Sequence, residues 1–91
     1  MHAVVTRVSV EDAGSATEQL RGEVVPRVSQ APGFVAGYWV RLEGADEGIS
    51  VIAFESEDAA RAAADQIRQA VEGNTGVSLK DVTVGEVVAN A

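Results

Sequence analysis

The sequence has no cysteine, a single histidine and only two prolines among its 91 residues. The absence of cysteine excludes disulfide bonds, thiolate nucleophiles and zinc–thiolate sites. A single histidine makes a metal cluster or a nucleophilic triad implausible, since each needs a positioned imidazole or several ligands together. Glycine-rich loops with the spacing of phosphate or dinucleotide sites are also absent. We therefore expect no bound metal and no cofactor.

Positive charge is scarce: seven Lys and Arg stand against 14 Asp and Glu, which gives a formal net charge of −7. A chain of this kind lacks the basic footprint that nucleic acids and anionic lipids require. No apolar run approaches the roughly 20 residues of a membrane helix, and the start of the chain has no signal-peptide pattern. We expect a cytoplasmic protein that binds neither nucleic acid nor membrane.

Large side chains are few as well, because aromatic residues make up 4% of the chain while it contains 16 Val and 15 Ala. A chain of this length predicts one domain, residues 1–91, with a thin hydrophobic core. Self-association is the expected source of further burial.

The period of the apolar residues predicts six elements in the order β-α-β-β-α-β. Strands are predicted at residues 3–10, 34–42, 49–55 and 82–89, with one helix opening on a capping box at residues 15–18 and another over residues 57–71. Pro26 predicts a kink or an early end of the first helix, because it lacks an N–H and crowds the carbonyl of Gly22. A turn is predicted at residues 31–33.

This order is typical of the ferredoxin-like α+β plait, a four-stranded antiparallel sheet with two helices on one face. The other face would be bare, and it is not polar, because residues poorly suited to solvent fall on it whichever way the register falls: Val5, Val35, Trp39, Ile52, Val84 and Val88. The sequence does not decide which face Trp39 occupies, since a shift of one residue exchanges the two sets. A bare apolar face on so small a chain predicts an interface. We expect a homodimer through this open face, with a cavity enclosed between the two sheets.

Three segments resemble the dimeric α/β-barrel superfamily, and within it the small antibiotic-biosynthesis-monooxygenase-like (ABM-like) proteins: Ala31-Pro32-Gly33-Phe34, Gly37-Tyr38-Trp39 and Phe54-Glu55-Ser56. The resemblance spans nearly the whole chain and implies a ferredoxin-like dimeric α/β barrel. Members of that superfamily include cofactor-independent oxygenases, heme-degrading enzymes and lactone isomerases.

The chain departs from two branches of that superfamily. In the monooxygenase branch a Trp commonly ends the third strand and a His follows in the next helix. Here Phe54 takes the strand end, where it is a candidate ligand-binding residue, and the helix at residues 57–71 contains no His. The heme-degrading branch uses Asn, His and Trp together, whereas His2 is the only histidine here.

Tyr38 and Trp39 are the first candidates for ligand binding. Neighbours on a strand point to opposite faces, so one of the two would face the inter-sheet cavity and orient a planar ligand. Packing in the core is the alternative for each of them.

Three charged or titratable residues complete the candidates. Arg7 and Arg41 would bind an anionic ligand or stabilise an enolate, unless they form an interchain ion pair with an acid such as Glu86. His2 would move a proton, unless it is solvated at the chain terminus. His2 and Arg41 are therefore the candidate catalytic residues.

Two functions remain open at this point. The chain would be a homodimeric protein that binds a small hydrophobic or aromatic compound and acts on it as a cofactor-independent monooxygenase or isomerase. Alternatively, it would be a non-catalytic dimer with a ligand-sensing, stress-related or structural role.

Overall fold

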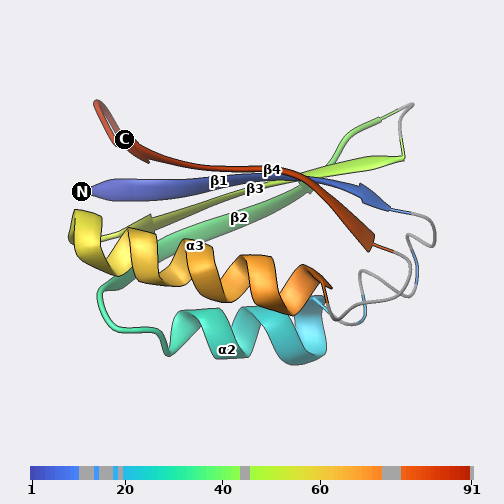
Figure 1. Cartoon of the computed structure of the whole chain (residues 1–91), viewed down its shortest axis with the longest axis horizontal. Coiled ribbons are helices and arrows are strands. Elements are labelled where there is room, and N and C mark those ends of the chain that lie inside the picture. Colours follow the sequence, from blue (N-terminus) through green and yellow to red (C-terminus); the bar gives the residue numbers. More distant parts are fainter. Residues whose placement is uncertain (11–13, 15–17, 19, 44–45, 73–76, 91) are drawn as a thin grey trace.

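The computed structural model describes residues 1–10, 14, 18, 20–43, 46–72 and 77–90 of the chain (Figure 1). Within them lie β1 (His2–Val10), η1 (Leu20–Val24), α2 (Val25–Ser29), β2 (Phe34–Arg41), β3 (Glu47–Phe54), α3 (Glu57–Glu72) and β4 (Val77–Glu86). None of the described helices is both long and apolar enough to cross a membrane.

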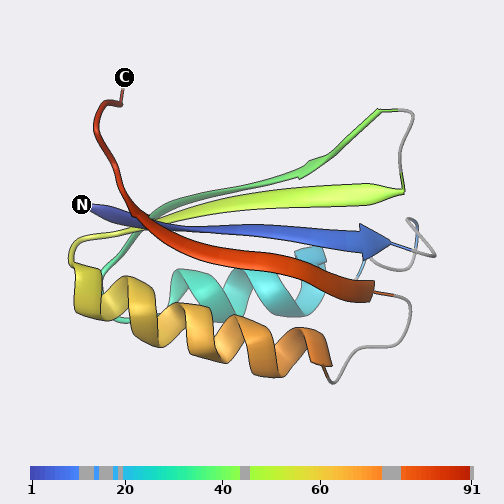
Figure 2. The ribbon, with the colours of Figure 1, turned by 45° about the horizontal axis from the view of Figure 1, so that its top comes forward.

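The strands form one sheet in the order β2-β3-β1-β4, and every neighbouring pair is antiparallel. Both α2 and α3 lie on the same face of this sheet, as Figures 1 and 2 show from two directions. Helix α2 packs on β2, whereas α3 packs mainly on β4 and β1. The predicted ferredoxin-like plait is confirmed.

The last strand differs most from its prediction, because β4 covers Val77–Glu86 and not residues 82–89. It pairs with β1 over nearly the whole length of that strand, from His2↔Glu86 to Val10↔Val77, with a register shift between Arg7 and Val8. Backbone hydrogen bonds to β1 form whatever the side chains are, so residues 78–81, of which three are polar and one is Leu79, belong to the strand although their pattern does not predict it.

The first helix changes type just before Pro26. Residues Leu20–Val24 form a π-helix, and Val25–Ser29 continue as an α-helix with Pro26 in its first turn. Because helical residues precede it, Pro26 lacks the N–H that would bond to the preceding turn, and this accounts for the change of helix type just before it. The prediction located the irregularity correctly, but the helix continues past the proline. Residues 15–17 of the predicted capping box lie outside the described residues.

The predicted turn brings two of the resemblance segments together. Gly33 has φ of 78°, a conformation that favours glycine. Its carbonyl accepts a hydrogen bond of 2.8 Å from the N–H of Glu55. The Pro-Gly-Phe turn and the Phe-Glu-Ser strand end therefore meet at the end of the sheet where α3 begins.

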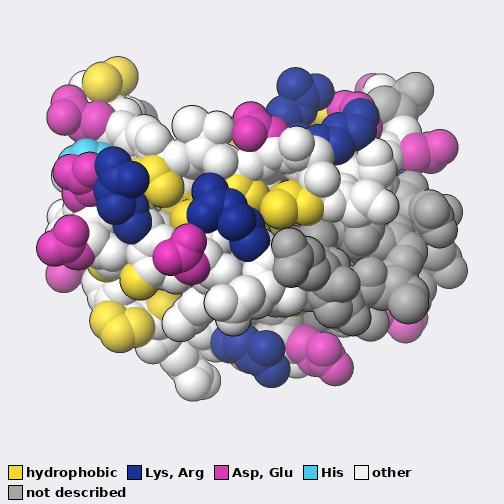
Figure 3. All heavy atoms as spheres, in the orientation of Figure 1, with side chains coloured by type: hydrophobic (Ala, Val, Ile, Leu, Met, Phe, Trp, Pro, Cys, Tyr) yellow, Lys and Arg dark blue, Asp and Glu magenta, His cyan; other side chains and the backbone are white. Residues whose placement is uncertain are grey.

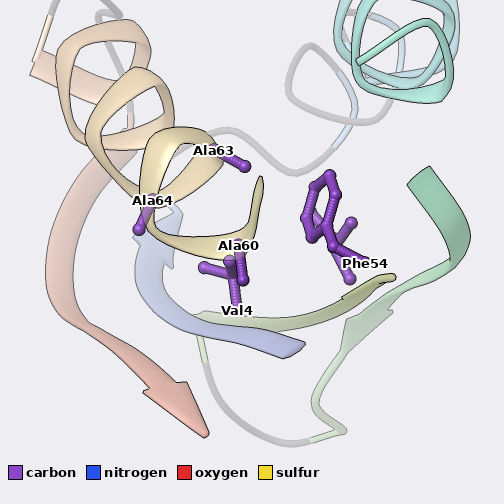
Figure 4. Close-up of a cluster of buried hydrophobic side chains, with 6 residues drawn as sticks. Val4, Phe54, Ala60, Ala63 and Ala64 are labelled. Atoms are coloured by element: carbon purple, nitrogen blue, oxygen red, sulfur yellow. The ribbon is translucent and has the colours of Figure 1, made fainter. Parts of the chain in front are cut away.

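The core is small and built largely from short side chains. Its buried members are Val4, Ile52, Phe54, Ala60, Ala63 and Ala64. Figure 4 shows Val4 beneath Ala60 of α3, and Phe54 directed from β3 toward the helices. The alanines let α3 approach the sheet closely, so one large ring, fully buried, can fill the remaining space.

Strand register decides which side chains face the helices. Val4 pairs with Ile52 and with Val84, and all three point to the helices. Trp39 packs on the same core. The placement of Ile52 and Val84 on the bare face was therefore wrong, and the face of Trp39, which the sequence leaves open, is the helix-facing one. The parity of a strand is set by its neighbours and not by its own pattern.

The bare face, called the open face below, is nevertheless apolar. Val5 pairs with Val51, which pairs with Tyr38, and all three are exposed on the side away from the helices. Val40, in the next row, is 52% exposed. The two other residues predicted for this face, Val35 at a strand irregularity and Val88 beyond β4, are also exposed.

Replacing Phe54 by alanine tests its role as the main filler of the core. Its ring meets that of Phe34 edge to face, with centroids 6.2 Å apart and an interplanar angle of 79°. We expect Phe54→Ala to lower the free energy of unfolding by about 3–5 kcal/mol, measured by urea denaturation. Val88→Ala, at a residue 88% exposed, should change it by less than about 0.5 kcal/mol. Similar losses in the two variants would contradict this assignment.

Candidate functional site

Three side chains with hydrogen-bonding groups form a row across the helix-facing side of the sheet. Trp39 of β2 pairs with Ser50 of β3, and Ser50 pairs with Thr6 of β1. We call these three residues the polar row. Thr6 is 3% exposed and Ser50 is 9% exposed. The adjacent row toward the end where α3 begins is apolar, with Ile52 and Val4 in its centre. The polar row therefore interrupts an otherwise apolar surface.

The hydroxyl of Thr6 is buried and has no hydrogen-bond partner among the described residues. An unsatisfied buried hydroxyl costs roughly 1–3 kcal/mol of stability, and valine would fill the same volume without that cost. Such a group therefore calls for an explanation, of which a bound molecule is one. This oxygen is the strongest indication of a binding position on the helix-facing side.

The polar row lies where the packing of the core changes. On one side of it are the fully buried Val4, Ile52 and Phe54. The half-buried residues around and beyond it, among those described, are Val8, Trp39, Ile67, Leu79 and Val82. Close packing thus holds the sheet and α3 together at one end, and the described apolar side chains around the polar row are only half-buried.

Arg7 lies on the opposite side of the sheet from the polar row. Its Nη2 is 3.2 Å from Oε2 of Glu47, and Lys80 binds the other oxygen of the same carboxylate. Hydrogen bonds from Lys80 and then Arg7 hold the pKa of Glu47 below its usual 4.5. The ion pair predicted as the alternative for Arg7 therefore exists within one chain, and its acid is Glu47 in place of Glu86.

The charged groups elsewhere are dispersed. Basic and acidic side chains alternate over the face drawn in Figure 3, without a large area of one sign. On α3, Arg61 pairs with Glu57 and Arg68 pairs with Asp65, all on the exposed side of the helix.

His2 is a folded part of the sheet, so the expectation of a solvated terminal residue was wrong. It pairs with Phe54 on one side and Glu86 on the other. Its Nε2 is 4.0 Å from Oε2 of Glu57, and its side chain is 25% exposed. Four residues of strand separate His2 from Thr6, or about 14 Å. The imidazole therefore lies far from the hydroxyls of the polar row.

The remaining candidates are also apart from one another. Tyr38 is 69% exposed on the open face, and Phe54 is fully buried in the core. Arg41 is exposed and shares the helix-facing parity of Trp39, since it pairs with Gly48 two residues further along, in the adjacent row. Of the predicted ligand-binding residues, the structure thus brings only Trp39 into the polar row, with Arg41 next to it along β2.

Sequence reasoning missed Thr6 and Ser50, although a signal for both was available. Thr6 has the parity of Val4 and Val8, and Ser50 has the parity of Ile52. A hydroxyl residue between apolar residues of the same parity marks a polar interruption of a buried surface. The predicted ligand-binding residues were aromatic or charged, and none of them was a hydroxyl residue of this kind.

Comparison with solved structures shows the fold clearly. A point mutant of MhuD with two manganese protoporphyrin IX molecules per active site matches with a TM-score of 0.66 and 20% sequence identity, over 100% of this chain and 98% of that one. The heme-degrader MhuD from Mycobacterium tuberculosis with two hemes in its active site matches with a TM-score of 0.57 and 23% identity, over 97% and 98% of the two chains.

These neighbours confirm the fold that the predicted resemblance implies. No protein-family model and no curated protein sequence matches the chain.

The ion cluster of Glu47 makes stability depend on pH. Because the folded protein lowers the pKa of this carboxyl, the unfolded chain binds a proton more readily. The stabilisation is thus full above the usual pKa of 4.5 and is lost as the pH falls below it. We expect Glu47→Gln to be less stable than wild type at pH 7 and to lose less stability between about pH 5 and pH 3, measured by urea denaturation. Glu23→Gln, an exposed carboxyl of η1 outside the cluster, is the control. A Glu47→Gln profile parallel to that of wild type would contradict the assignment.

Proposed function

We propose that this chain forms a homodimer through its open face and binds a small planar, hydrophobic or aromatic compound between its sheet and its helices. The observation that carries the binding proposal is the buried hydroxyl of Thr6, which has no partner among the described residues. The apolar surface around it favours a mostly apolar ligand with few polar atoms.

The polar row supplies two kinds of contact for such a ligand. Trp39 and Thr6 are separated by two strand spacings, roughly 9–10 Å, with Ser50 between them. An indole can contact the face of an aromatic ring, while a hydroxyl both donates and accepts hydrogen bonds. The row therefore suits a compound of about two fused rings that carries an oxygen substituent. Arg41, further along β2, is the candidate residue for binding an acidic group of a longer ligand.

The geometry supports binding over cofactor-independent oxygenase or isomerase chemistry. Acid–base catalysis needs groups within hydrogen-bond reach of one substrate. Arg7 is on the other side of the sheet and occupied by Glu47. His2 and Arg41 lie toward opposite ends of the helix-facing surface, separated by roughly 20 Å of strand. Of the two functions that the sequence leaves open, this dispersion favours the non-catalytic, ligand-sensing one.

The porphyrins bound by the structural neighbours raise the question of heme. Protein ligands of heme iron are His, Cys, Met and Tyr side chains. The chain has no Cys, and it has one residue of each other kind: His2, Met1 and Tyr38. His2 lies beside Glu57 at the end of the sheet, and Tyr38 is on the open face. Hydroxyls and an indole do not ligate iron well, so the residues of the polar row do not fit a heme-iron centre.

The open face supports the dimer. Its central residues Val5, Val51 and Tyr38 form a continuous row across three strands, and Val40 follows in the next row. Soluble monomers seldom expose an apolar sheet surface of this kind. Two such faces packed about 10 Å apart would bury it, and the Glu47 ion cluster would lie toward one end of the strands, where charges stay hydrated.

A charge at the centre of the open face should prevent dimer formation. We expect Val51→Glu to sediment as a monomer at concentrations at which the wild type is a dimer, because pairing would bury an unpaired carboxylate. Analytical ultracentrifugation across a concentration series measures this. Ala62→Glu, on the exposed side of α3, adds the same charge away from the face and should remain dimeric. A monomeric wild type would refute the dimer.

Removing the hydroxyl of Thr6 tests the ligand site. The probe is 2-naphthol, titrated by calorimetry into the wild type and into Thr6→Val. We expect Thr6→Val to bind about five- to tenfold more weakly, the equivalent of one hydrogen bond. The unliganded variant should be as stable as wild type or more so, because it no longer buries an unsatisfied oxygen.

Thr83→Val is the matched control for that experiment. Thr83 is exposed on β4, where its hydroxyl donates to Asp81. The same change of threonine to valine should leave binding of 2-naphthol unaltered. Equal affinity in wild type and Thr6→Val, or no binding by wild type, would refute the proposed site.

A further inference from the structure

We propose that Gly37 determines the specificity of the polar row, because it lets the distal ring of the Trp39 indole pack closely against β2 and so favours flat aromatic ligands over saturated ones. The inference rests on the proposed function and names the class of compound that the site selects. Its basis is the contact between Gly37 and Trp39.

The indole folds back along its own strand over Gly37. A Cβ added at Gly37 would lie 2.9 Å from Cη2 of Trp39, closer than real Cβ contacts, and 3.0 Å from Cζ3, which is tighter than most of them, so the indole would have to shift. The same Cβ would be 3.6 Å from Cε2 of Phe34. The distal ring of Trp39 therefore rests on bare backbone beside Phe34, and any side chain at position 37 would displace it.

Space, and not backbone conformation, is what requires glycine here. Among the described residues Gly33 alone has a positive φ, so Gly37 adopts a conformation that any residue can take. Glycine inside a strand weakens it, because it has more backbone freedom to lose and no side chain to pack. Its presence in β2, opposite the fully buried Ile52, is therefore explained by the indole of Trp39, which approaches the backbone closely at this position.

An indole held in this way is a rigid platform. One part of it is in contact with the strand and the core, and the residue as a whole remains half-buried. A flat aromatic ring gains from stacking or edge contact with such a platform, whereas a puckered saturated ring gains only apolar contact. A displaced indole would lose this geometry, and with it the preference for aromatic compounds.

The experiment compares two probes with the same carbon skeleton and hydroxyl group, 2-naphthol and decahydro-2-naphthol. Calorimetry should show that the wild type binds the flat 2-naphthol about three- to tenfold more tightly. In Gly37→Ala this preference should disappear, and the near-ultraviolet circular dichroism of Trp39, the only tryptophan, should change. Gly85→Ala is the matched control, since a Cβ at that strand glycine would meet nothing within 4 Å. It should retain both the preference and the spectrum.

A second pair of variants separates positioning of Trp39 from general damage to the strand. Phenylalanine lacks the distal ring that meets Gly37, so Trp39→Phe removes the clash. Adding Gly37→Ala to Trp39→Phe should then leave the binding of both probes unchanged and should not lower the stability, although Gly37→Ala alone changes the binding and lowers the stability. Equal effects of Gly37→Ala in the two backgrounds would overturn the inference.

The outcomes for the probes distinguish this inference from the proposed function. Equal affinity of the wild type for the two probes, or an unchanged preference in Gly37→Ala, overturns the role of Gly37 alone. Binding of neither probe by the wild type overturns the proposed function, and this inference with it. A preference that is lost in Gly37→Ala and kept in Gly85→Ala establishes it.

Discussion

The register between β1 and its two neighbours is the constraint on which the rest of the structure depends. Because Val4 pairs with Ile52 and Val84, the side chains of alternate residues on the central strands point to the helices together. A shift of one residue would exchange the two faces. It would expose the core residues and turn the hydroxyl of Thr6 away from the helices. The core, the polar row and the open face are thus consequences of one pairing.

The small core follows from composition. With 15 alanines and few large side chains, the chain brings α3 close to the sheet through Ala60, Ala63 and Ala64, and it fills the remaining space with Phe54. Such a core is complete at one end of the sheet and thins toward the polar row. The core on one face is thin, and the other face is apolar. Both therefore favour the binding of a partner or a ligand that buries more apolar surface.

The two faces of the sheet carry functional side chains of different kinds. Charged groups that could attract an anion, such as Arg7, are tied into an ion cluster on the open face. The polar row on the helix-facing side offers hydroxyls and an indole among apolar side chains, which suit a largely neutral, flat molecule, while His2 and Arg41 lie toward the two ends of that side. The fold is that of the porphyrin-binding neighbours, but the residues of the polar row are not of the kinds that hold a heme iron. The shared architecture thus leaves the ligand to the side chains of each protein.

The sequence by itself determined the order of the elements, the plait and the apolar character of both sides of the sheet, because hydrophobic period and turn residues are local signals. The sequence also located the change of helix type near Pro26. The extent of β4 and the faces of Trp39 and Ile52 were decided by pairing between strands, which the pattern of a single strand does not contain. The same holds for the candidate site. Thr6 and Ser50 lie 44 positions apart in the chain, and only the tertiary structure brings them next to Trp39 and leaves one hydroxyl buried without a partner among the described residues.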